Sequence, residues 1–285
     1  MNKIYKVVWS KVKNCYVVVS ELAKNVITGG VKSAKVGSSM ASGLAMGALM
    51  AFVITGNAWA ADLTINVAGD DVKTGISNGG KAVLVTDAYA NDGALTVNAV
   101  ASSIATYGNN ANMSVVADSI TLNTTDSTAV LVTRDTLDNS TGNNHLTITA
   151  TKGDLKVNGT GDAHGVAVAN NNGSLTLNAA GTVSVKATEN AVYARNDGAT
   201  ITLNGADVTV ESTGTQANAG KGHAVYVDKK AQVDINATGD VTLKAADGKY
   251  AIGIVGGEDL LTGAVVNVTA VGDVDVDGQD RKSVV

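Results

Sequence analysis

Alternating aspartates near the end of the chain are the first residues whose spacing suggests chemistry. Asp273, Asp275 and Asp277 are separated by single valines, which resembles the opening of a calcium loop, where carboxylates surround a hard cation. Val284 stands where such a loop needs its bidentate glutamate. The same alternation is typical of a strand whose acidic side chains face solvent. We therefore expect no calcium site here.

Two histidines occupy equivalent places in different repeats of the chain. His164 and His223 each precede a predicted strand, with Asn190 at the corresponding place between them. If the repeats stack as a parallel solenoid, two turns separate the histidines by about 10 Å, whereas a zinc–histidine bond measures about 2.0–2.1 Å. We expect both to be solvated turn residues. His145 has no partner visible in the sequence, so we predict no metal and no cofactor.

Charged residues that would suit a carbohydrate-active enzyme are dispersed. A polysaccharide lyase or hydrolase needs clustered carboxylates and a base such as Arg or Lys. The nearest candidates lie in two predicted loops, Arg134 with Asp135 and Asp138 in one, and Glu258 with Asp259 in the other. Several repeats separate the two loops, and neither has an aromatic subsite. We expect no catalytic residues and no enzymatic activity.

An aromatic pair is the remaining candidate for contact with a ligand. Tyr193 and Tyr226 share an outward position in adjacent repeats, and their rings can stack on the surface. Such a ladder suits contact with a sugar or a partner protein. The alternative is a cross-strand pair that serves only packing. Both interpretations stay open on the sequence alone.

Short alternating strands must position all of these residues. Apolar and polar residues alternate in LTLN, TVSV and AVYA between residues 174 and 194, and the pattern then restarts with ITLN and DVTV. Alternation of this kind indicates half-buried strands, and strand triplets that recur along the chain indicate a solenoid. The sequence therefore predicts an all-β fold, a right-handed parallel β-helix of about seven to eight three-strand coils over residues 61–285.

Three sets of inward-facing residues define three faces of this β-helix, because side chains alternate between core and solvent along a strand. The first set is Leu63/Ile65, Leu95/Val97, Met113/Val115, Leu146/Ile148, Leu175/Leu177, Ile201/Leu203, Val233/Ile235 and Val266/Val268. The second is Val72, Ile120/Leu122, Leu155/Val157, Val183/Val185, Val208/Val210, Val241/Leu243 and Val274/Val276. The third is Val83/Val85, Val130/Val132, Val166/Val168, Val192, Val225/Val227 and Ile252/Ile254. Between Leu95 and Met113 the alignment is open, since Ile104 fits either the third face or the first strand of the next coil.

An asparagine follows most inward pairs of the first face. The residues in this register are Asn66, Asn98, Asn178, Asn204 and Asn236, with Thr149 and Thr269 substituting. Stacked amides can hydrogen-bond along the axis. A polar corner residue at each turn is the alternative, and both interpretations are structural.

Composition favours one elongated domain over two compact ones. The 285 residues include no proline, one cysteine, 32 glycines and 4% aromatic residues, whereas a globular core of this size uses several Phe and Trp. Residues 1–60 contain seven Lys and one acid, Glu21, for a charge of +6, so the whole-chain charge of −5 leaves −11 for the remainder. An acidic exterior argues against nucleic acid as a partner. Because the only cysteine is Cys15, the remainder cannot form disulfides.

The first sixty residues have the pattern of an export signal. Residues 40–55, MASGLAMGALMAFVIT, form an apolar run of signal-peptide length, too short for a comfortable membrane span. Ala58 and Ala60 supply the small residues at positions −3 and −1 for cleavage before Ala61. We therefore predict a helical signal segment, with an extension over residues 1–36 and the core and cleavage site over residues 37–60.

The extension carries a specific resemblance. The segment MNKIYKVVWSKVKNCYVVVSELAKN, with its MNKIY start, Trp9 and the VVVSELAK block, resembles the extended signal peptide region of large type V secreted proteins of Gram-negative bacteria. The resemblance implies export by the Sec machinery and passage through an outer-membrane translocator. Together with cysteine-free coils, it resembles a classical autotransporter passenger. That class implies a cell-surface or extracellular adhesin or autoaggregation protein, whose partners are a host surface glycan or protein, or like molecules on other cells.

Two alternatives remain beside this interpretation. A two-partner-secreted exoprotein has a similar fold, but its secretion domain typically carries Asn-Pro motifs, and this chain has no proline. A β-helical polysaccharide lyase or hydrolase is the alternative of a different class. Classical autotransporters end in a membrane β-barrel, whereas this sequence ends in GQDRKSVV directly after a predicted strand. We therefore expect residues 61–285 to be an incomplete passenger.

Overall fold

The chain forms two compact units, residues 1–56 and residues 57–285, which we describe separately. The computed structural model describes residues 5–10, 15–20, 61–67, 74–78, 83–85, 87–133, 143–214, 221–255 and 263–279. The predicted signal core and cleavage segment, residues 37–60 with Ala58 and Ala60, lies entirely outside these residues, whereas Ala61 is described. Val72 of the predicted second face also lies outside them.

The first unit contains an antiparallel hairpin. Strand β1 (Tyr5–Ser10) pairs with β2 (Cys15–Ser20), so that Tyr5 lies opposite Ser20 and Ser10 opposite Cys15. The predicted helical signal segment is therefore not confirmed, because the described parts of it are strands. Both strands are rich in valine and contain an aromatic residue, and such residues favour strands. The described residues contain no helix long and apolar enough to cross a membrane.

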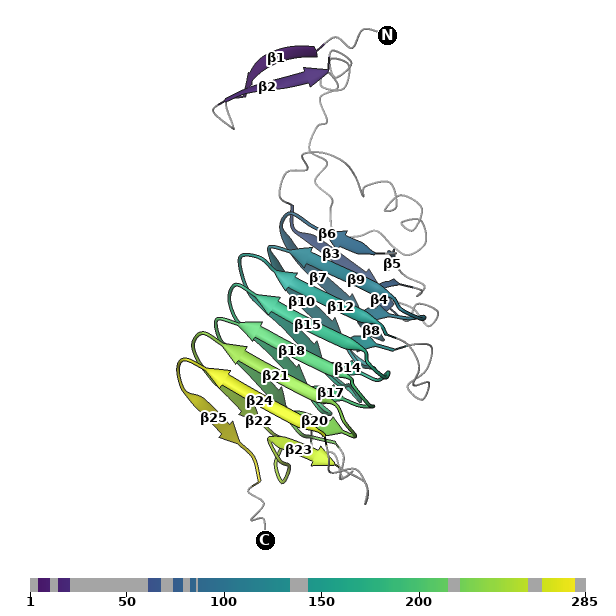
Figure 1. Ribbon diagram of the computed structural model, residues 1–285, viewed down its shortest axis with the longest axis vertical. Helices are drawn as coiled ribbons and strands as arrows, with labels where there is room; N and C mark the ends of the chain where they lie inside the picture. Colours follow the sequence, from purple (N-terminus) through teal and green to yellow (C-terminus); the bar gives the residue numbers. More distant parts are fainter. Residues whose placement is uncertain are drawn as a thin grey trace. The chain divides into compact units, whose positions relative to one another are not determined.

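The second unit is a parallel β-solenoid with three sheets (Figure 1). Each regular turn contributes one strand to each sheet, and equivalent strands of neighbouring turns pair in parallel. Sheet 1 contains β3 (Leu63–Val67), β7 (Ala94–Ala99), β10 (Ser119–Thr124), β13 (Leu155–Gly159), β16 (Val183–Ala187), β19 (Val208–Ser212), β22 (Val241–Lys244) and β25 (Val274–Asp277).

Sheets 2 and 3 complete the turns. Sheet 2 contains β4 (Thr74–Asn78), β5 (Val83–Leu84), β8 (Ser102–Thr106), β11 (Val130–Val132), β14 (Val166–Val168), β17 (Val192–Ala194), β20 (Val225–Asp228) and β23 (Ile252–Val255). Sheet 3 contains β6 (Ala88–Ala90), β9 (Asn112–Ala117), β12 (His145–Ala150), β15 (Ser174–Ala179), β18 (Thr200–Gly205), β21 (Gln232–Ala237) and β24 (Val265–Ala270).

The number of regular turns is lower than the sequence predicts. Complete turns run from β7 to β24, which is eighteen strands in three sheets and therefore six turns. The first turn is irregular, because β4 and β5 lie side by side in sheet 2. The last strand, β25, is the only described strand of its turn. The expected seven to eight coils counted both of these partial turns as complete.

The pairing also corrects the alignment of the first two turns. Leu63 pairs with Leu95, and Leu95 pairs with Ile120, so these residues belong to sheet 1 and not to the face of Met113. Ile104 pairs with both Ile76 and Val130, which places it on the third predicted face and settles the open choice. Alternation is the same on every face, so the pattern alone could not assign an irregular turn to the correct sheet.

Inward residues from all three sheets form one continuous core. Leu175, Leu177, Val183 and Val185 are fully buried, as predicted. The core is filled by Val, Leu, Ile and Ala, which suits a narrow interior. Exposure rises at the last turn described, where Val274 and Val276 of β25 are 49% and 53% exposed.

The asparagines form two ladders on different sheets. On sheet 1, Asn98 donates to Asn66, Asn123 to Asn98 and Asn158 to Asn123, over 2.7, 2.7 and 2.9 Å. On sheet 3, Asn204 donates to Asn178 and Asn236 to Asn204, over 2.8 and 2.9 Å. The sheet 1 register continues with charged residues, where Lys186 pairs with Glu211 at 3.0 Å. The amide-ladder interpretation is therefore confirmed, but the expected single ladder is wrong.

Removing one amide tests what a ladder contributes. Asn123 donates to one neighbour and accepts from the other, so Asn123→Ala deletes two hydrogen bonds and is expected to lower the free energy of unfolding by about 1–3 kcal/mol. Urea denaturation followed by circular dichroism measures the change. Thr121→Ala, on the same strand and the same outward face, reports the loss of strand preference alone, expected below about 1 kcal/mol. Equal losses in the two variants would contradict a stabilising ladder.

Candidate functional site

Four outward side chains form a patch on sheet 2. Tyr193 of β17 pairs with Tyr226 of β20, and Ala194 pairs with Val227, so the next outward pair is Arg195 and Asp228. All four outward residues are half-buried, whereas the residues between them point into the core and are buried. Strand alternation thus places two phenols and one pair of opposite charges on one face. We call Tyr193, Arg195, Tyr226 and Asp228 the aromatic patch.

The two tyrosine rings contact each other and two neighbouring histidines. The ring centroids of Tyr193 and Tyr226 lie 5.5 Å apart at an interplanar angle of 60°. His164 lies 4.9 Å from Tyr193, and His223 lies 5.2 Å from Tyr226. His223 also stacks on Tyr250, at 5.9 Å and 13°. Edge-to-face pairs at such distances are favourable, so the rings hold one another in place.

Tyr193 is anchored by a second, smaller apolar cluster. Ala105, Leu131 and Ala167 occupy the same outward register of sheet 2 in the preceding turns and are buried. Tyr193 packs against this cluster, as does Tyr107. Sheet 2 therefore has apolar residues on its outward face here as well as on its inward face. The aromatic patch extends this outward cluster from β17 to β20.

Gly253 lets the rings lie close to strand β23. It pairs with Tyr226, and a Cβ atom placed on it would lie 3.1 Å from Tyr226 Cδ2 and 3.0 Å from His223 Nδ1. Both distances are shorter than ordinary contacts, so a larger residue here would push the rings away from the sheet. The position of Tyr226 thus depends on a residue without a side chain.

Burial and charge both act on the phenols. Burial raises the pKa of Tyr193, the Arg195 guanidinium opposes this, and the Asp228 carboxylate adds to it. Burial likewise raises the pKa of Tyr226, and Asp228 raises it further. Both phenols are therefore neutral near pH 7 and able to donate as well as accept hydrogen bonds. The patch combines apolar ring surface with a donor group and an acceptor group at its rim.

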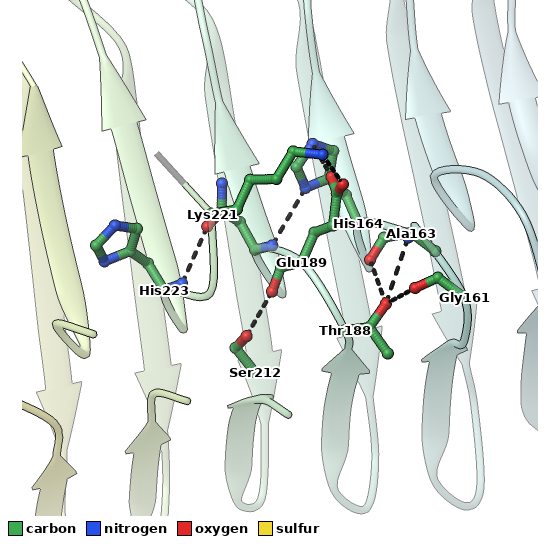
Figure 2. A network of polar contacts seen from close by, with 9 residues as sticks. Gly161, Ala163, His164, Thr188, Glu189, Ser212, Lys221 and His223 are labelled. Carbon is green, nitrogen blue, oxygen red and sulfur yellow. Dashed lines mark hydrogen bonds and ion pairs between the residues drawn. The ribbon is translucent and has the colours of Figure 1, made fainter. Parts of the chain in front are cut away.

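A buried ion cluster adjoins the patch, because one of its members, His164, contacts Tyr193. Figure 2 shows His164, Glu189 and Lys221 in this cluster. The carboxylate of Glu189, which is 5% exposed, receives His164 Nε2 at 3.0 Å on one oxygen and Lys221 Nζ on the other. Burial alone raises the pKa of Glu189, but the hydrogen bonds and charges of His164 and Lys221 outweigh it and lower the pKa to about 2. The three residues come from three successive turns, so the cluster ties these turns together.

Backbone contacts fix the orientation of both histidines. His164 Nδ1 accepts a hydrogen bond from the Asn190 backbone N–H at 3.2 Å, so its proton is on Nε2 and points at Glu189. His223 Nδ1 lies 3.0 Å from the carbonyl oxygen of Tyr250 and therefore carries a proton. His223 is 3% exposed and His164 is half-buried. The expectation that both are solvated turn residues is wrong, because rings and charges from neighbouring turns cover them.

The remaining predicted residues are not brought together. His145 has a partner that the sequence did not reveal, since its Nδ1 lies 2.6 Å from Ser174 Oγ. Asp275 and Asp277 are on the outward face of β25 and are exposed. Both loops proposed for an enzyme, residues 134–138 and 258–259, lie outside the described residues. The described residues contain no group of three or more His, Cys, Asp or Glu side chains that could hold a metal ion.

Sequence features could have indicated some of the site residues that were not predicted. Arg195 and Asp228 each follow a patch tyrosine by two positions, so alternation alone puts them on the same face. Glu189 directly precedes Asn190, which shares its register with the histidines. No periodicity in the sequence points to Lys221.

Fold and signal together define the class of protein. The second unit is a parallel β-solenoid with three sheets around an apolar core, as predicted for a passenger. Residues 1–51 match the family described as the extended signal peptide of the type V secretion system. The chain thus carries a type V secretion signal ahead of a passenger-like solenoid, which confirms the resemblance to autotransporters and implies Sec export and an outer-membrane translocator. Neither a curated protein nor a solved structure matches the chain.

Proposed function

We propose that the chain is a non-enzymatic adhesin or autoaggregation protein, the passenger region of an autotransporter at the cell surface. The observation that carries the proposal is the aromatic patch on the outer face of a regular solenoid that follows a type V signal. The solenoid supplies an extended spacer, because its turns stack one on the next along a single axis. The patch supplies ring surface and paired polar groups suited to contact.

Coated beads test the adhesive function. We expect beads that carry the exported, folded chain to attach to host cells or to clump with one another, well above beads that carry the same chain after heat unfolding. Absence of both attachment and clumping would contradict the proposal. Release of reducing ends or unsaturated products from a polysaccharide panel would contradict its non-enzymatic part.

A further inference from the structure

We propose that the aromatic patch binds the apolar face of a neutral saccharide, with Arg195 donating hydrogen bonds to its hydroxyl groups and Asp228 accepting hydrogen bonds from them. This inference rests on the proposed adhesive function and names its ligand class. The patch is defined by strand register and ring geometry, as described above.

The ring geometry suits one sugar ring. Tyr193 and Tyr226 stand at 60° to each other with centroids 5.5 Å apart, and both residues are half-buried, so part of their apolar surface is open to a small ring. His164 and His223 contact the tyrosine rings in tilted arrangements, at 46° and 32°, and restrict their rotation. A site whose rings are already fixed loses little side-chain entropy on binding.

The polar groups at the rim favour hydroxyl groups over ionic ones. A guanidinium offers five N–H donors, so Arg195 can hydrogen-bond the Tyr193 hydroxyl and still donate to a ligand. Asp228 offers only acceptors. A saccharide hydroxyl both donates and accepts, so it matches this pair.

Charge argues against an anionic polysaccharide at this site. The patch itself has one positive and one negative side chain, and residues 61–285 carry a net charge of −11, obtained by subtracting +6 from −5. Asp228 would repel a carboxylate or sulfate bound beside Tyr226. The surrounding acidic exterior would lower the local concentration of any polyanion.

The size of the patch argues against a protein partner. A stable protein interface buries about 800 Å² on each side, contributed by about 20–30 residues. Four half-buried side chains expose far less than this area. A small ligand needs only a few convergent polar groups beside apolar surface, and the aromatic patch provides both.

Affinity electrophoresis of the exported chain tests the inference. The probes are neutral polysaccharides (dextran, mannan and galactan) and anionic ones (polygalacturonate and heparin), each cast into a native gel. We expect at least one neutral polysaccharide to retard the chain. Tyr226→Leu and Asp228→Asn are each expected to weaken this retardation by about tenfold. The matched controls, Tyr107→Leu on the same sheet and Asp275→Asn on β25, are expected to change it by less than about twofold.

The outcomes separate the ligand class from the adhesive function. Retardation by anionic polysaccharides alone, or retardation that both patch variants leave unchanged, would overturn the inference. Bead adhesion without retardation by any neutral polysaccharide would overturn it too, while the proposed function would stand. Patch-dependent retardation without adhesion would support the inference and overturn the proposed function. If Tyr226→Leu loses its circular dichroism signal, Asp228→Asn, which preserves side-chain shape, decides.

Discussion

Replacement of Glu189 by alanine is expected to lower the free energy of unfolding by about 3 kcal/mol. The side chain is 6% exposed, and the variant leaves His164 and Lys221 without the carboxylate that both contact. Removing one partner of a buried ion pair is costly because the other charge stays desolvated. Partial exposure of Lys221, at 33%, lets water relieve some of this cost, so we expect the lower end of the usual range. Urea denaturation followed by circular dichroism measures the loss.

An exposed ion pair on another sheet serves as the matched control. Glu211 pairs with Lys186 at 3.0 Å on the outer face of sheet 1, where the lysine side chain is 50% exposed. Glu211→Ala is therefore expected to cost less than about 1 kcal/mol. If Glu189→Ala costs no more than Glu211→Ala, the cluster does not tie the turns together.

The same carboxylate gives a defined pH dependence. The pKa of Glu189 is lowered from 4.5 to about 2 in the folded chain, so the unfolded chain binds a proton at higher pH than the folded chain does. Its contribution to stability is complete above pH 4.5 and is lost as the pH falls through 2. Unfolding free energies measured across this window should decline more steeply for the wild-type chain than for Glu189→Gln, which cannot titrate. Parallel declines would show that other acids dominate.

Strand alternation was sufficient to predict the solenoid, because the same physical constraint repeats in every turn. Each inward Val, Leu or Ile packs against apolar residues of the turns above and below it. A wrong strand assignment in one turn therefore leaves the assignment of the other turns unchanged. The assignment failed at Leu63 and Leu95, which lie on either side of the irregular first turn, because all faces have the same period. Pairing partners come from chain geometry, which the pattern does not encode.

The candidate site was only half predictable for a related reason. Tyr193 and Tyr226 were found because they repeat, and their role as a contact surface stays a prediction. Glu189 and Lys221 are not part of a repeating pattern, and although His164 shares its register with His223, the sequence does not indicate that it contacts them. Their contacts depend on the conformation of the segments that precede the sheet 2 strands, and strand alternation does not predict that conformation. His223 seemed solvated in the sequence because nothing there indicated that Tyr226 and Tyr250 cover it.

Substitution of Leu177 by alanine tests the core of the solenoid directly. Leu177 is completely buried, with 0% exposure to water. It lies between Ile148 of β12 and Leu203 of β18 in the stack. The variant leaves a cavity in the middle of the stack and is expected to lower the free energy of unfolding by about 2–5 kcal/mol. Thr176→Ala, the adjacent residue on the outward face, is expected to cost less than about 1 kcal/mol.

The position of this cavity in a solenoid predicts where the damage spreads. Because each turn contacts only its two neighbours, amide hydrogen exchange should accelerate most in β12, β15 and β18 and least in the distant strand β7. In a compact domain, whose core residues pack together irrespective of turn, the same cavity would instead reduce protection from hydrogen exchange in all strands. Uniform acceleration, or equal losses for Leu177→Ala and Thr176→Ala, would contradict nearest-neighbour packing as the source of stability. Local acceleration would show that the rod stays folded on either side of a damaged turn, which a surface spacer needs.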